Sequence, residues 1–278
     1  MKINAINTPT LKEKDFIRFS KFIYEKCGIC LHEGKKELVR ARLNKRLRET
    51  GISDFEEYYD YMINDKTGEE MIVMIDAIST NMTSFYREKQ HFDFLYEHVF
   101  PDYKKGKFGK RLRFWSSACS SGEEPYTIAI CFFDFFGLDS DFDVKILATD
   151  ISTKVLETAQ SGIYPAERTS GIPMEILKNY FQKGKQKNQG LHRVKRDVKR
   201  IIKFKRLNLM ETFPFKPIFN FIFCRNVMIY FDKITQENLI NKFYDCIVPE
   251  GYLMIGHSES MTGINHKFKY IKPSIYQK

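Results

Sequence analysis

Residues 112–136 limit the possible folds of this 278-residue chain more than any other segment. Their pattern predicts a buried strand (112–117), a turn of small residues, and a helix that begins near Pro125. Proline suits that position, because the first turn of a helix leaves its backbone N–H unpaired in any case. A strand that passes through such a turn into a helix is typical of the first crossover of a doubly wound sheet. In such sheets, ligands bind beyond the carboxyl ends of the strands.

The rest of the second half continues this alternation. Apolar runs predict further strands, and periodic apolar residues predict helices between them; the strands are expected at 144–149, 201–207, 219–224 and 252–255, and the helices at 125–136, 153–160 and 237–247. Alternating strands and helices indicate an α/β fold with a parallel sheet and helices on both faces.

One strongly basic segment, at about 168–200, interrupts the alternation. Residues 178–206 contain twelve Lys and Arg and one acid, Asp197, and Gly184 and Gly190 bracket a polar turn. The weak alternation after Gly190 is typical of a half-exposed hairpin. We expect a small antiparallel β-subdomain inserted in the main sheet domain.

The first eighty residues have a helical pattern throughout. A helix ending near Gly28, a second at 35–50, a third that begins at Ser53 with a capping box to Glu56, and a fourth around 71–78 would form a small bundle. We therefore expect an all-α N-terminal domain at 1–80 and a sheet domain at 81–278.

Composition narrows the class of protein. With 43% apolar and 15% aromatic residues, the chain can bury a substantial core, which excludes wholesale disorder. Residues 1–14 have no apolar run of signal-peptide length, and nothing reaches the roughly 18 apolar residues of a membrane span, so we expect a cytoplasmic protein. Cys27 and Cys30 have CxxC spacing without a second ligand pair, so we expect free thiols and no metal. The net charge of +10 indicates an acidic partner: nucleic acid, anionic lipid or an acidic protein surface.

The turn after the first strand indicates what the sheet binds. It has one glycine, Gly122, and matches neither a GxGxxG sequence nor a phosphate-binding loop with its lysine. Glu123 and Glu124 would repel phosphate and suit a cation, although acids at a helix N-terminus are also favoured by the helix dipole. Asp150, at the end of the second strand, is placed to accept hydrogen bonds from ribose hydroxyls. A cationic adenosine compound without phosphates fits this description, as S-adenosylmethionine does.

Six motifs, in order and at similar spacing, resemble the chemotaxis receptor methyltransferase (CheR) family over nearly the whole chain. They are residues 80–88 (TNMTSFYRE), 120–126 (SSGEEPY), 148–150 (ATD), 208–209 (NL), 223–232 (FCRNVMIYFD) and 251–259 (GYLMIGHSE). The resemblance implies a Rossmann-like S-adenosylmethionine-dependent methyltransferase sheet with an inserted β-subdomain behind an all-α domain.

The resemblance also implies site residues. Contacts with S-adenosylmethionine are expected from the segment between the domains, the turn and the strand ends, namely from Asn81, Thr83, Arg87, Glu124 in preference to Glu123, Asp150, Asn208, Leu209, Arg225 and Asn226. Arg87 and Tyr230 would face the reacting centre as catalytic residues. His257 and Glu259 could serve the site, but a structural hydrogen-bonding role is at least as well supported.

The implied reaction transfers a methyl group to glutamate side chains of methyl-accepting chemotaxis receptors, giving glutamyl methyl esters and S-adenosylhomocysteine. A glutamate carboxylate, with an ordinary pKa of about 4.3, is already a nucleophile at neutral pH, so no general base is required. The basic run at 35–48, with seven Lys and Arg and one acid, is expected to dock an acidic helical bundle of the receptor, unless it is only a solvated helix face. The basic hairpin could bind a receptor's C-terminal tail peptide as an added strand.

Two other functions remain open at this point. The charge suits a nucleic-acid methyltransferase, but the chain has no Asn-Pro-Pro-Tyr-type tetrapeptide and no aromatic residues interleaved with its basic surface. A non-catalytic, S-adenosylmethionine-sensing module that binds receptors is the second alternative; the presence of Arg87 and Tyr230 argues against it.

Overall fold

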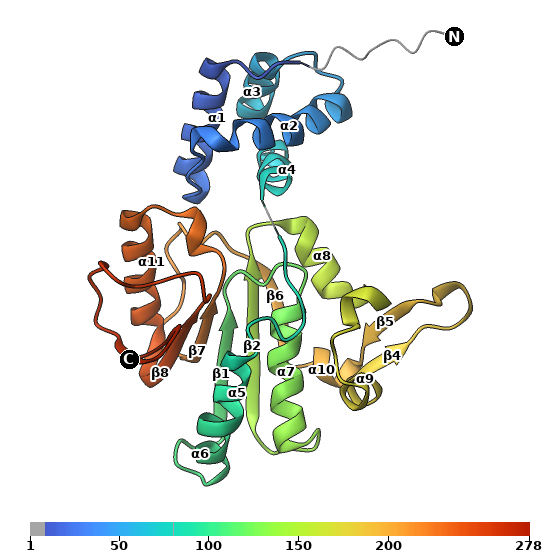
Figure 1. Cartoon of the computed structure of the whole chain (residues 1–278), viewed down its shortest axis with the longest axis vertical. Coiled ribbons are helices and arrows are strands. Elements are labelled where there is room, and N and C mark those ends of the chain that lie inside the picture. The colour runs from blue at the N-terminus through green and yellow to red at the C-terminus, as the bar shows by residue number, and fades with distance from the viewer. Residues whose placement is uncertain (1–8, 80) are drawn as a thin grey trace. The chain divides into compact units, whose positions relative to one another are not determined.

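The computed structural model describes residues 9–79 and 81–278. Residues 1–8 and Thr80, which belong to the expected N-terminal segment and to the first family motif, lie outside them. The chain divides into two compact units (Figure 1): a helical unit of residues up to 79 together with Tyr230–Asp232, and a sheet unit of residues 81–229 and 233–278. The domain boundary expected after residue 80 stays our proposal.

The helical unit consists of four α-helices around an aromatic and aliphatic core. Their bounds are α1 Glu13–Cys27, α2 Lys36–Thr50, α3 Phe55–Asn64 and α4 Glu69–Ile78, with a 3-10 turn at Glu33–Lys35. Helix α1 ends at Gly28, whose φ of 72° is the left-handed cap expected of glycine. The N-cap of α3 is Asp54, which accepts the amide of Glu57 at 2.9 Å. The expected capping box from Ser53 to Glu56 was therefore wrong, because the carboxylate one residue later takes the capping position.

The main sheet of the sheet unit has seven strands in the order β6-β2-β1-β7-β8-β10-β9. Its strands are β1 Arg111–Ser116, β2 Asp143–Asp150, β6 Ile202–Arg206, β7 Phe219–Cys224, β8 Ile247–Ile255, β9 Lys269–Lys272 and β10 Ile275–Gln277. The first five strands of this order run parallel, as predicted, whereas β10 is antiparallel to both β8 and β9. The sequence analysis did not predict the two C-terminal strands, which turn the expected parallel sheet into a mixed one.

Helices cover both faces of this sheet. Phe114 on β1 stacks on Phe221 within the core that α7 covers, while the next residue, Trp115, contacts Phe243 of α11. Neighbouring residues of a strand point to opposite faces, so α7 and α11 lie on opposite sides. The helices are α5 Gln90–Phe94, a π-helical turn Leu95–Val99, α6 Phe100–Lys104, α7 Glu123–Phe136, α8 Thr153–Ser161, α9 Met174–Tyr180, α10 Arg196–Lys199 and α11 Lys233–Cys246, with short 3-10 turns at Ala166–Thr169, Gln186–Asn188 and Met228–Tyr230.

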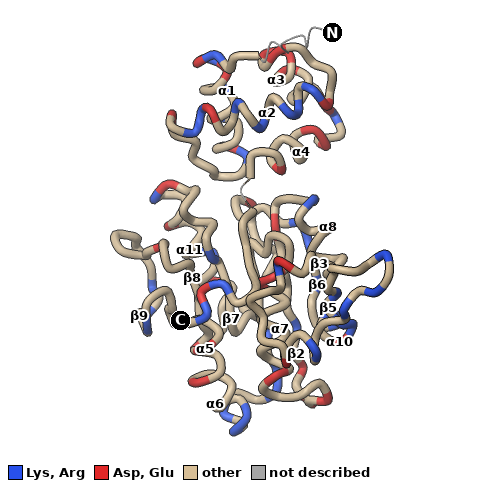
Figure 2. The backbone as a smooth tube through the Cα atoms, turned by 45° about the vertical axis from the view of Figure 1, so that its right-hand side comes forward, with Lys and Arg blue, Asp and Glu red and all other residues tan. Residues whose placement is uncertain are grey.

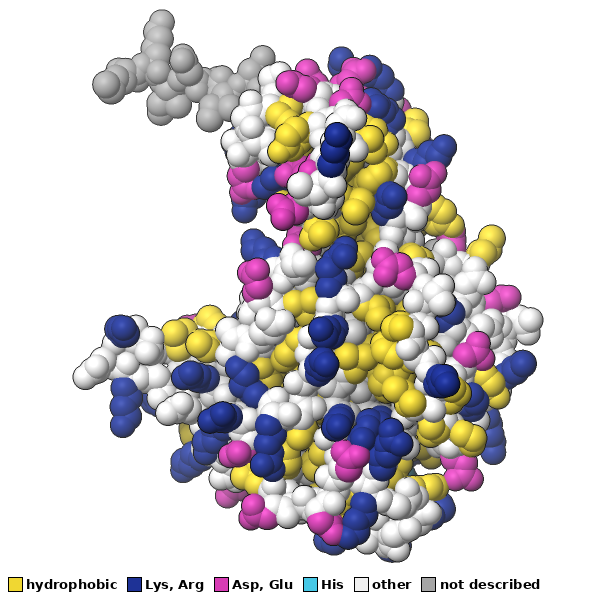
Figure 3. All heavy atoms as spheres, turned by 180° about the vertical axis from the view of Figure 1, so that it is seen from behind, with side chains coloured by type: hydrophobic (Ala, Val, Ile, Leu, Met, Phe, Trp, Pro, Cys, Tyr) yellow, Lys and Arg dark blue, Asp and Glu magenta, His cyan; other side chains and the backbone are white. Residues whose placement is uncertain are grey.

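The predicted antiparallel insertion is present as a separate three-stranded sheet in the order β3-β5-β4. Its strands are β3 Ile163–Pro165, β4 Phe181–Lys183 and β5 Leu191–Val194, so it begins before the expected residue 168. We call residues 163–194 the inserted subdomain. Figure 2 marks Lys and Arg positions along the backbone of its hairpin and of α10, and Figure 3, seen from behind, shows Lys and Arg side chains spread over the same end of the sheet unit. In the described parts of the chain, no helix has the length and apolar character needed to cross a membrane.

Candidate active site

The parallel strands bring four polar segments to one edge of the sheet. Ser116 of β1 pairs with Ala148 of β2 and with Phe223 of β7, and Cys224 of β7 pairs with Ile255 of β8. The residues that follow these strands therefore meet at the carboxyl edge. This edge is where an open α/β sheet binds its ligand.

Asp150 anchors the turn after β1. Its carboxylate accepts the backbone amide of Ser120 through Oδ2 at 2.8 Å and the amide of Ser152 through Oδ1 at 3.0 Å. The hydroxyl of Ser120 donates to the carbonyl of Asn81 at 2.9 Å, which ties the 81–88 segment to the same turn. Asp150 is 6% exposed, so its carboxylate is fixed by the backbone around it.

Gly122 ends the turn in a conformation and a space that only glycine tolerates. Its φ is 98°, in the left-handed region. A Cβ at this position would lie 2.9 Å from the Cβ of Ala159 and 2.9 Å from the hydroxyl of Tyr164. The turn therefore lies directly against α8 and β3.

Glu123 and Glu124 start α7 and point to different partners. Glu124 accepts the hydroxyl of Ser116 at 2.7 Å and Nη1 of Arg225 at 2.8 Å. Glu123 accepts the hydroxyl of Ser121 at 2.8 Å and forms an ion pair with Arg168. Burial raises the pKa of both carboxyl groups, against the opposing effect of these partners. Of the two, Glu124 is the one that faces the Arg225 side of the edge.

Arg225, just after β7, is the centre of the site. Its side chain is 2% exposed, and its guanidinium contacts Glu88 at 3.1 Å, Glu124 at 2.8 Å and the backbone carbonyl of Arg87. Burial alone would raise the pKa of Glu88, but the hydrogen bond from Asn226 and the charge of Arg225 hold it below its ordinary value. Two carboxylates around one guanidinium leave one net negative charge, which favours a ligand with positive charge.

Asn226 is held from both sides by carboxylates. Its side-chain amide donates to Glu88 at 3.0 Å and its backbone amide donates to Glu259 at 3.0 Å. Glu259 also accepts the amides of Gly256 at 2.6 Å and Ile229 at 3.3 Å. Asn226 has a φ of 57°, which is uncommon outside glycine, so these bonds fix a strained position in the wall of the site.

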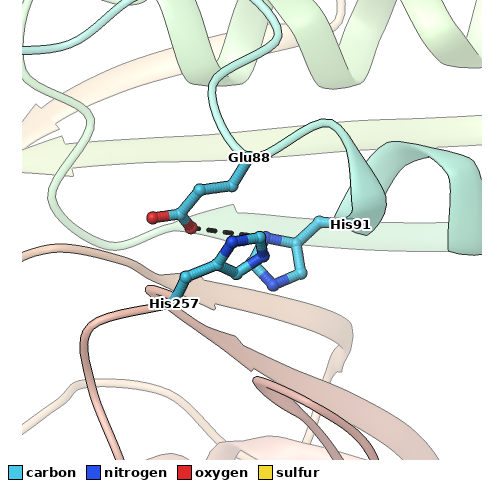
Figure 4. A group of neighbouring side chains, drawn as sticks. All are labelled: Glu88, His91 and His257. Atoms are coloured by element: carbon cyan, nitrogen blue, oxygen red, sulfur yellow. Dashed lines mark ion pairs between the residues drawn. The ribbon is translucent and has the colours of Figure 1, made fainter.

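Glu88, His91 and His257 form the cluster drawn in Figure 4. One potential ligand atom from each residue lies within 4.8 Å of the others. Both oxygens of Glu88 are already hydrogen-bonded, one of them to the guanidinium of Arg225 at 3.1 Å. A divalent cation bound there would sit close to that buried positive charge, so these residues fit a metal ion poorly. Burial, with the charge of Arg225 acting in the same direction, lowers the pKa of His91 to about 3, so its ring is neutral.

The remaining residues expected at the site lie in three places. Asn208 and Leu209 follow β6, beside Asp150, whose carbonyl accepts the amide of Leu207 at 3.1 Å. Thr83 is partly buried on the 81–88 segment, and the guanidinium of Arg87 donates to the carbonyl of Met82 at 2.8 Å. Tyr230 groups with the helical unit, where its carbonyl accepts the amide of Cys30, so its expected role at the reacting centre stays a prediction.

Sequence reasoning missed Glu88 and did not select Glu259. Both residues are in quoted motifs, and both join segments that are far apart along the chain. Glu88 is separated from Asn226 by 138 positions, and Glu259 by 33. The sequence alone held no signal that separates these two acids from others, because only the fold brings their partners to them.

Comparisons with known proteins agree with this architecture. Residues 81–276 match the family described as "CheR methyltransferase, SAM binding domain", and residues 14–79 match "CheR methyltransferase, all-alpha domain". The chain is 42% identical to a chemotaxis protein methyltransferase of Borreliella burgdorferi, over 96% of this chain and 95% of that protein. It is 38% identical to a chemotaxis protein methyltransferase of Salmonella typhimurium, over 96% of this chain and 90% of that one. It is 36% identical to a chemotaxis protein methyltransferase of Escherichia coli, over 96% of this chain and 91% of that protein.

Proposed function

We propose, because this chain belongs to the CheR methyltransferase family, that it methylates glutamate side chains of chemotaxis receptors. The family and its curated members make the chain an S-adenosylmethionine-dependent methyltransferase of chemotaxis. The glutamate carboxylate as acceptor, and the parts of the receptor that are bound, are the finer steps of our proposal.

One observation carries the cofactor assignment: the carboxyl edge combines a fixed acid, Asp150, with a net negative charge around Arg225 and has no phosphate-binding loop. S-adenosylmethionine presents a ribose, a sulfonium, an ammonium and a carboxylate. Asp150 would accept from the ribose hydroxyls, Glu124 would pair with the ammonium, and Arg225 would pair with the carboxylate.

The other expected contacts surround this core. Asn208 and Leu209, beside Asp150, would flank the adenine. Asn226 would line the wall next to Arg225. Asn81, Thr83 and Arg87 would close over the cofactor from the 81–88 segment, which already bonds to the turn through Ser120.

The reaction requires the protein mainly to position the substrate relative to the cofactor. The bound cofactor supplies an electrophilic methyl group on sulfur. An incoming glutamate is ionised at neutral pH, so the side chains here need to align its oxygen with the methyl and exclude water. Arg87 would orient that carboxylate through guanidinium N–H groups other than the one that it donates to the carbonyl of Met82. Tyr230 would position the substrate without taking a proton.

The receptor would bind through opposite charge. Several basic residues of α2 already have partners within the helical unit; Arg46, for example, pairs with the nearly buried Glu70 at 2.8 Å. The candidates for contact with an acidic helical bundle are three exposed residues: Lys35 just before α2, Arg48, and Lys45, which also lies 3.7 Å from Glu49. In the inserted subdomain, β4 is an edge strand, which supports the proposal that a receptor tail peptide adds to it.

Incubation of the protein with S-adenosylmethionine labelled in the methyl group and receptor-containing membranes tests this function. Glutamyl methyl esters release volatile labelled methanol when base is added, whereas N-methyl and nucleic-acid base products do not. We expect alkali-labile label on the receptor. Alkali-stable label, or label on added RNA or DNA, would instead support a nucleic-acid methyltransferase, and cofactor binding without any transfer would support a sensing module.

A further inference from the structure

The inserted subdomain contacts the turn after β1 directly, through two side chains. Tyr164 of β3 is fully buried and donates its hydroxyl to the carbonyl of Ser121 at 2.6 Å. Arg168 donates from Nη2 to the hydroxyl of Ser121 at 3.0 Å and lies 2.5 Å from Oε1 of Glu123. The turn that borders the cofactor site is thus held from the side of the subdomain as well as from the side of Asp150.

The ion pair is unequal in its exposure. The side chain of Glu123 is 0% exposed, while that of Arg168 is 37% exposed. The contact with Oε1 is an ion pair without the alignment of a hydrogen bond, and the other oxygen accepts from Ser121. Among the described residues, Arg168 is the one cation that forms an ion pair with Glu123. A buried carboxylate that loses its cation is strongly destabilised, so the position of Glu123 depends on Arg168.

Glu123 and Ser121 are close in sequence to the groups that define the pocket. Ser121 follows Ser120, whose amide donates to Asp150 at 2.8 Å, and Glu123 precedes Glu124, which bonds Arg225. A shift of Ser121 therefore moves the backbone next to the Ser120–Asp150 contact. A shift of Glu123 moves the backbone next to the Glu124–Arg225 contact. Gly122, between them, lies so close to α8 and β3 that an added Cβ would be 2.9 Å from both Ala159 and Tyr164, so the turn is closely packed on the side of the subdomain.

We propose that Arg168 is a positioning residue for the cofactor, which acts through Glu123 and Ser121 on the turn that orients Asp150 and Glu124. The inserted subdomain and the cofactor pocket are then energetically coupled. Coupling between two sites is reciprocal, so the cofactor that binds the ordered turn also stabilises the subdomain. This inference rests on the proposed cofactor pocket and adds to it a role for the subdomain.

Substitution of Arg168 tests the positioning role. In Arg168→Gln we expect a rise in the KM for S-adenosylmethionine and in the Kd for S-adenosylhomocysteine of about 5- to 150-fold, the usual range of coupling between sites. Turnover at saturating cofactor should change by less than about twofold, because the reacting groups are intact. Arg168→Lys, which keeps the charge, should recover part of the affinity.

Arg200→Gln is the matched control, because Arg200, between α10 and β6, contacts the carbonyl of Leu138 and the ring of Phe133 and not the turn after β1. We expect it to bind the cofactor as the wild type does. Equal cofactor affinity in Arg168→Gln and Arg200→Gln would overturn the proposal. So would a loss of turnover in Arg168→Gln without a change in KM.

Hydrogen exchange of the wild type and Arg168→Gln, with and without S-adenosylhomocysteine, tests the coupling itself. In the wild type, the product should slow exchange at residues 163–194 as well as at the pocket. In Arg168→Gln, saturated with product, the slowing should be confined to the pocket. If S-adenosylhomocysteine bound to the wild type without slowing exchange at 163–194, this inference alone would be contradicted. If it did not bind to the wild type at all, the proposed function would be contradicted as well.

Discussion

Asp150 joins the backbone of the turn to the expected ribose contact. In Asp150→Asn, one of the two oxygens that accept backbone amides becomes an N–H₂ group, and the ribose loses a charged acceptor. Bonds to a charged acceptor contribute about 1.5–3 kcal/mol, so we expect the affinity for S-adenosylhomocysteine to fall roughly 10- to 150-fold. Calorimetric titration measures it. Asp143→Asn, at the exposed start of the same strand, is the control and should bind normally.

His91 gives a prediction of pH dependence. Its pKa falls from an ordinary 6.5 to about 3 on folding, next to Glu88, Arg225 and His257. Between these two pH values the unfolded chain binds one more proton than the folded one, so the free energy of unfolding decreases as the pH falls from 6.5 towards 3. The decrease from this group is at most about 1.4 kcal/mol per pH unit.

Urea unfolding at several pH values should therefore show a shallower loss of stability in His91→Gln than in the wild type. His98→Asn, a change at an exposed histidine, serves as the control. Equal slopes in His91→Gln and the wild type would show that His91 is protonated to the same extent in both states.

Some residues of the site could be predicted from the sequence and others could not. Asp150, Glu124 and Arg225 could be selected because each stands at a strand end or helix start whose position the sequence predicts. Glu88 and Glu259 could not, because their importance comes from partners that only the folded sheet brings to them.

At the level of elements, the turn between β1 and α7 makes the sharpest prediction. Gly122→Ala combines a left-handed φ of 98° with two contacts at 2.9 Å. Gly263→Ala has a similar φ of 74° and nothing within 4 Å of the added Cβ. Both should lose about 1 kcal/mol for the backbone, and Gly122→Ala should lose about 1–3 kcal/mol more for the overlap.

Chemical unfolding and cofactor titration of the two variants measure the difference. We expect weaker cofactor binding in Gly122→Ala alone. If the two variants were equally stable and bound the cofactor equally, the close approach of the turn to α8 and β3 would be incorrect.

The elements that could be predicted from the sequence are those with an uninterrupted pattern. The apolar strands β1, β2 and β7, and helix α7 with its proline, are of this kind. The segment 90–104 was not assigned, because its helical periodicity is broken by a π-helical turn and Pro101. Strands β9 and β10 are short, and β9 is largely exposed, so neither shows the alternation that predicts a strand.

For the whole molecule, the net charge of +10 predicts a salt-dependent encounter with an acidic receptor. Charges on the surface are screened beyond about 10 Å at 0.1 M salt, whereas buried pairs such as Arg225 with Glu124 are screened much less. An increase from about 50 to 300 mM salt should therefore raise the KM for receptor severalfold and leave turnover nearly unchanged. Receptor methylation kinetics at several salt concentrations measure both.

Titration of S-adenosylhomocysteine over the same salt range is the control, and its Kd should change little by comparison. A KM for receptor that does not respond to salt would contradict recognition by charge. Such a result would mean that the protein recognises the receptor by shape and apolar contact.

The proposed function depends on what the carboxyl edge of the sheet binds. A crystal structure of the complex with S-adenosylhomocysteine measures this most directly. We predict the ribose hydroxyls within hydrogen-bond distance of Asp150, the amino acid end between Glu124 and Arg225, and the sulfur open to an incoming side chain. A nucleoside bound elsewhere, or bound with Asp150 and Arg225 both out of contact, would contradict the account.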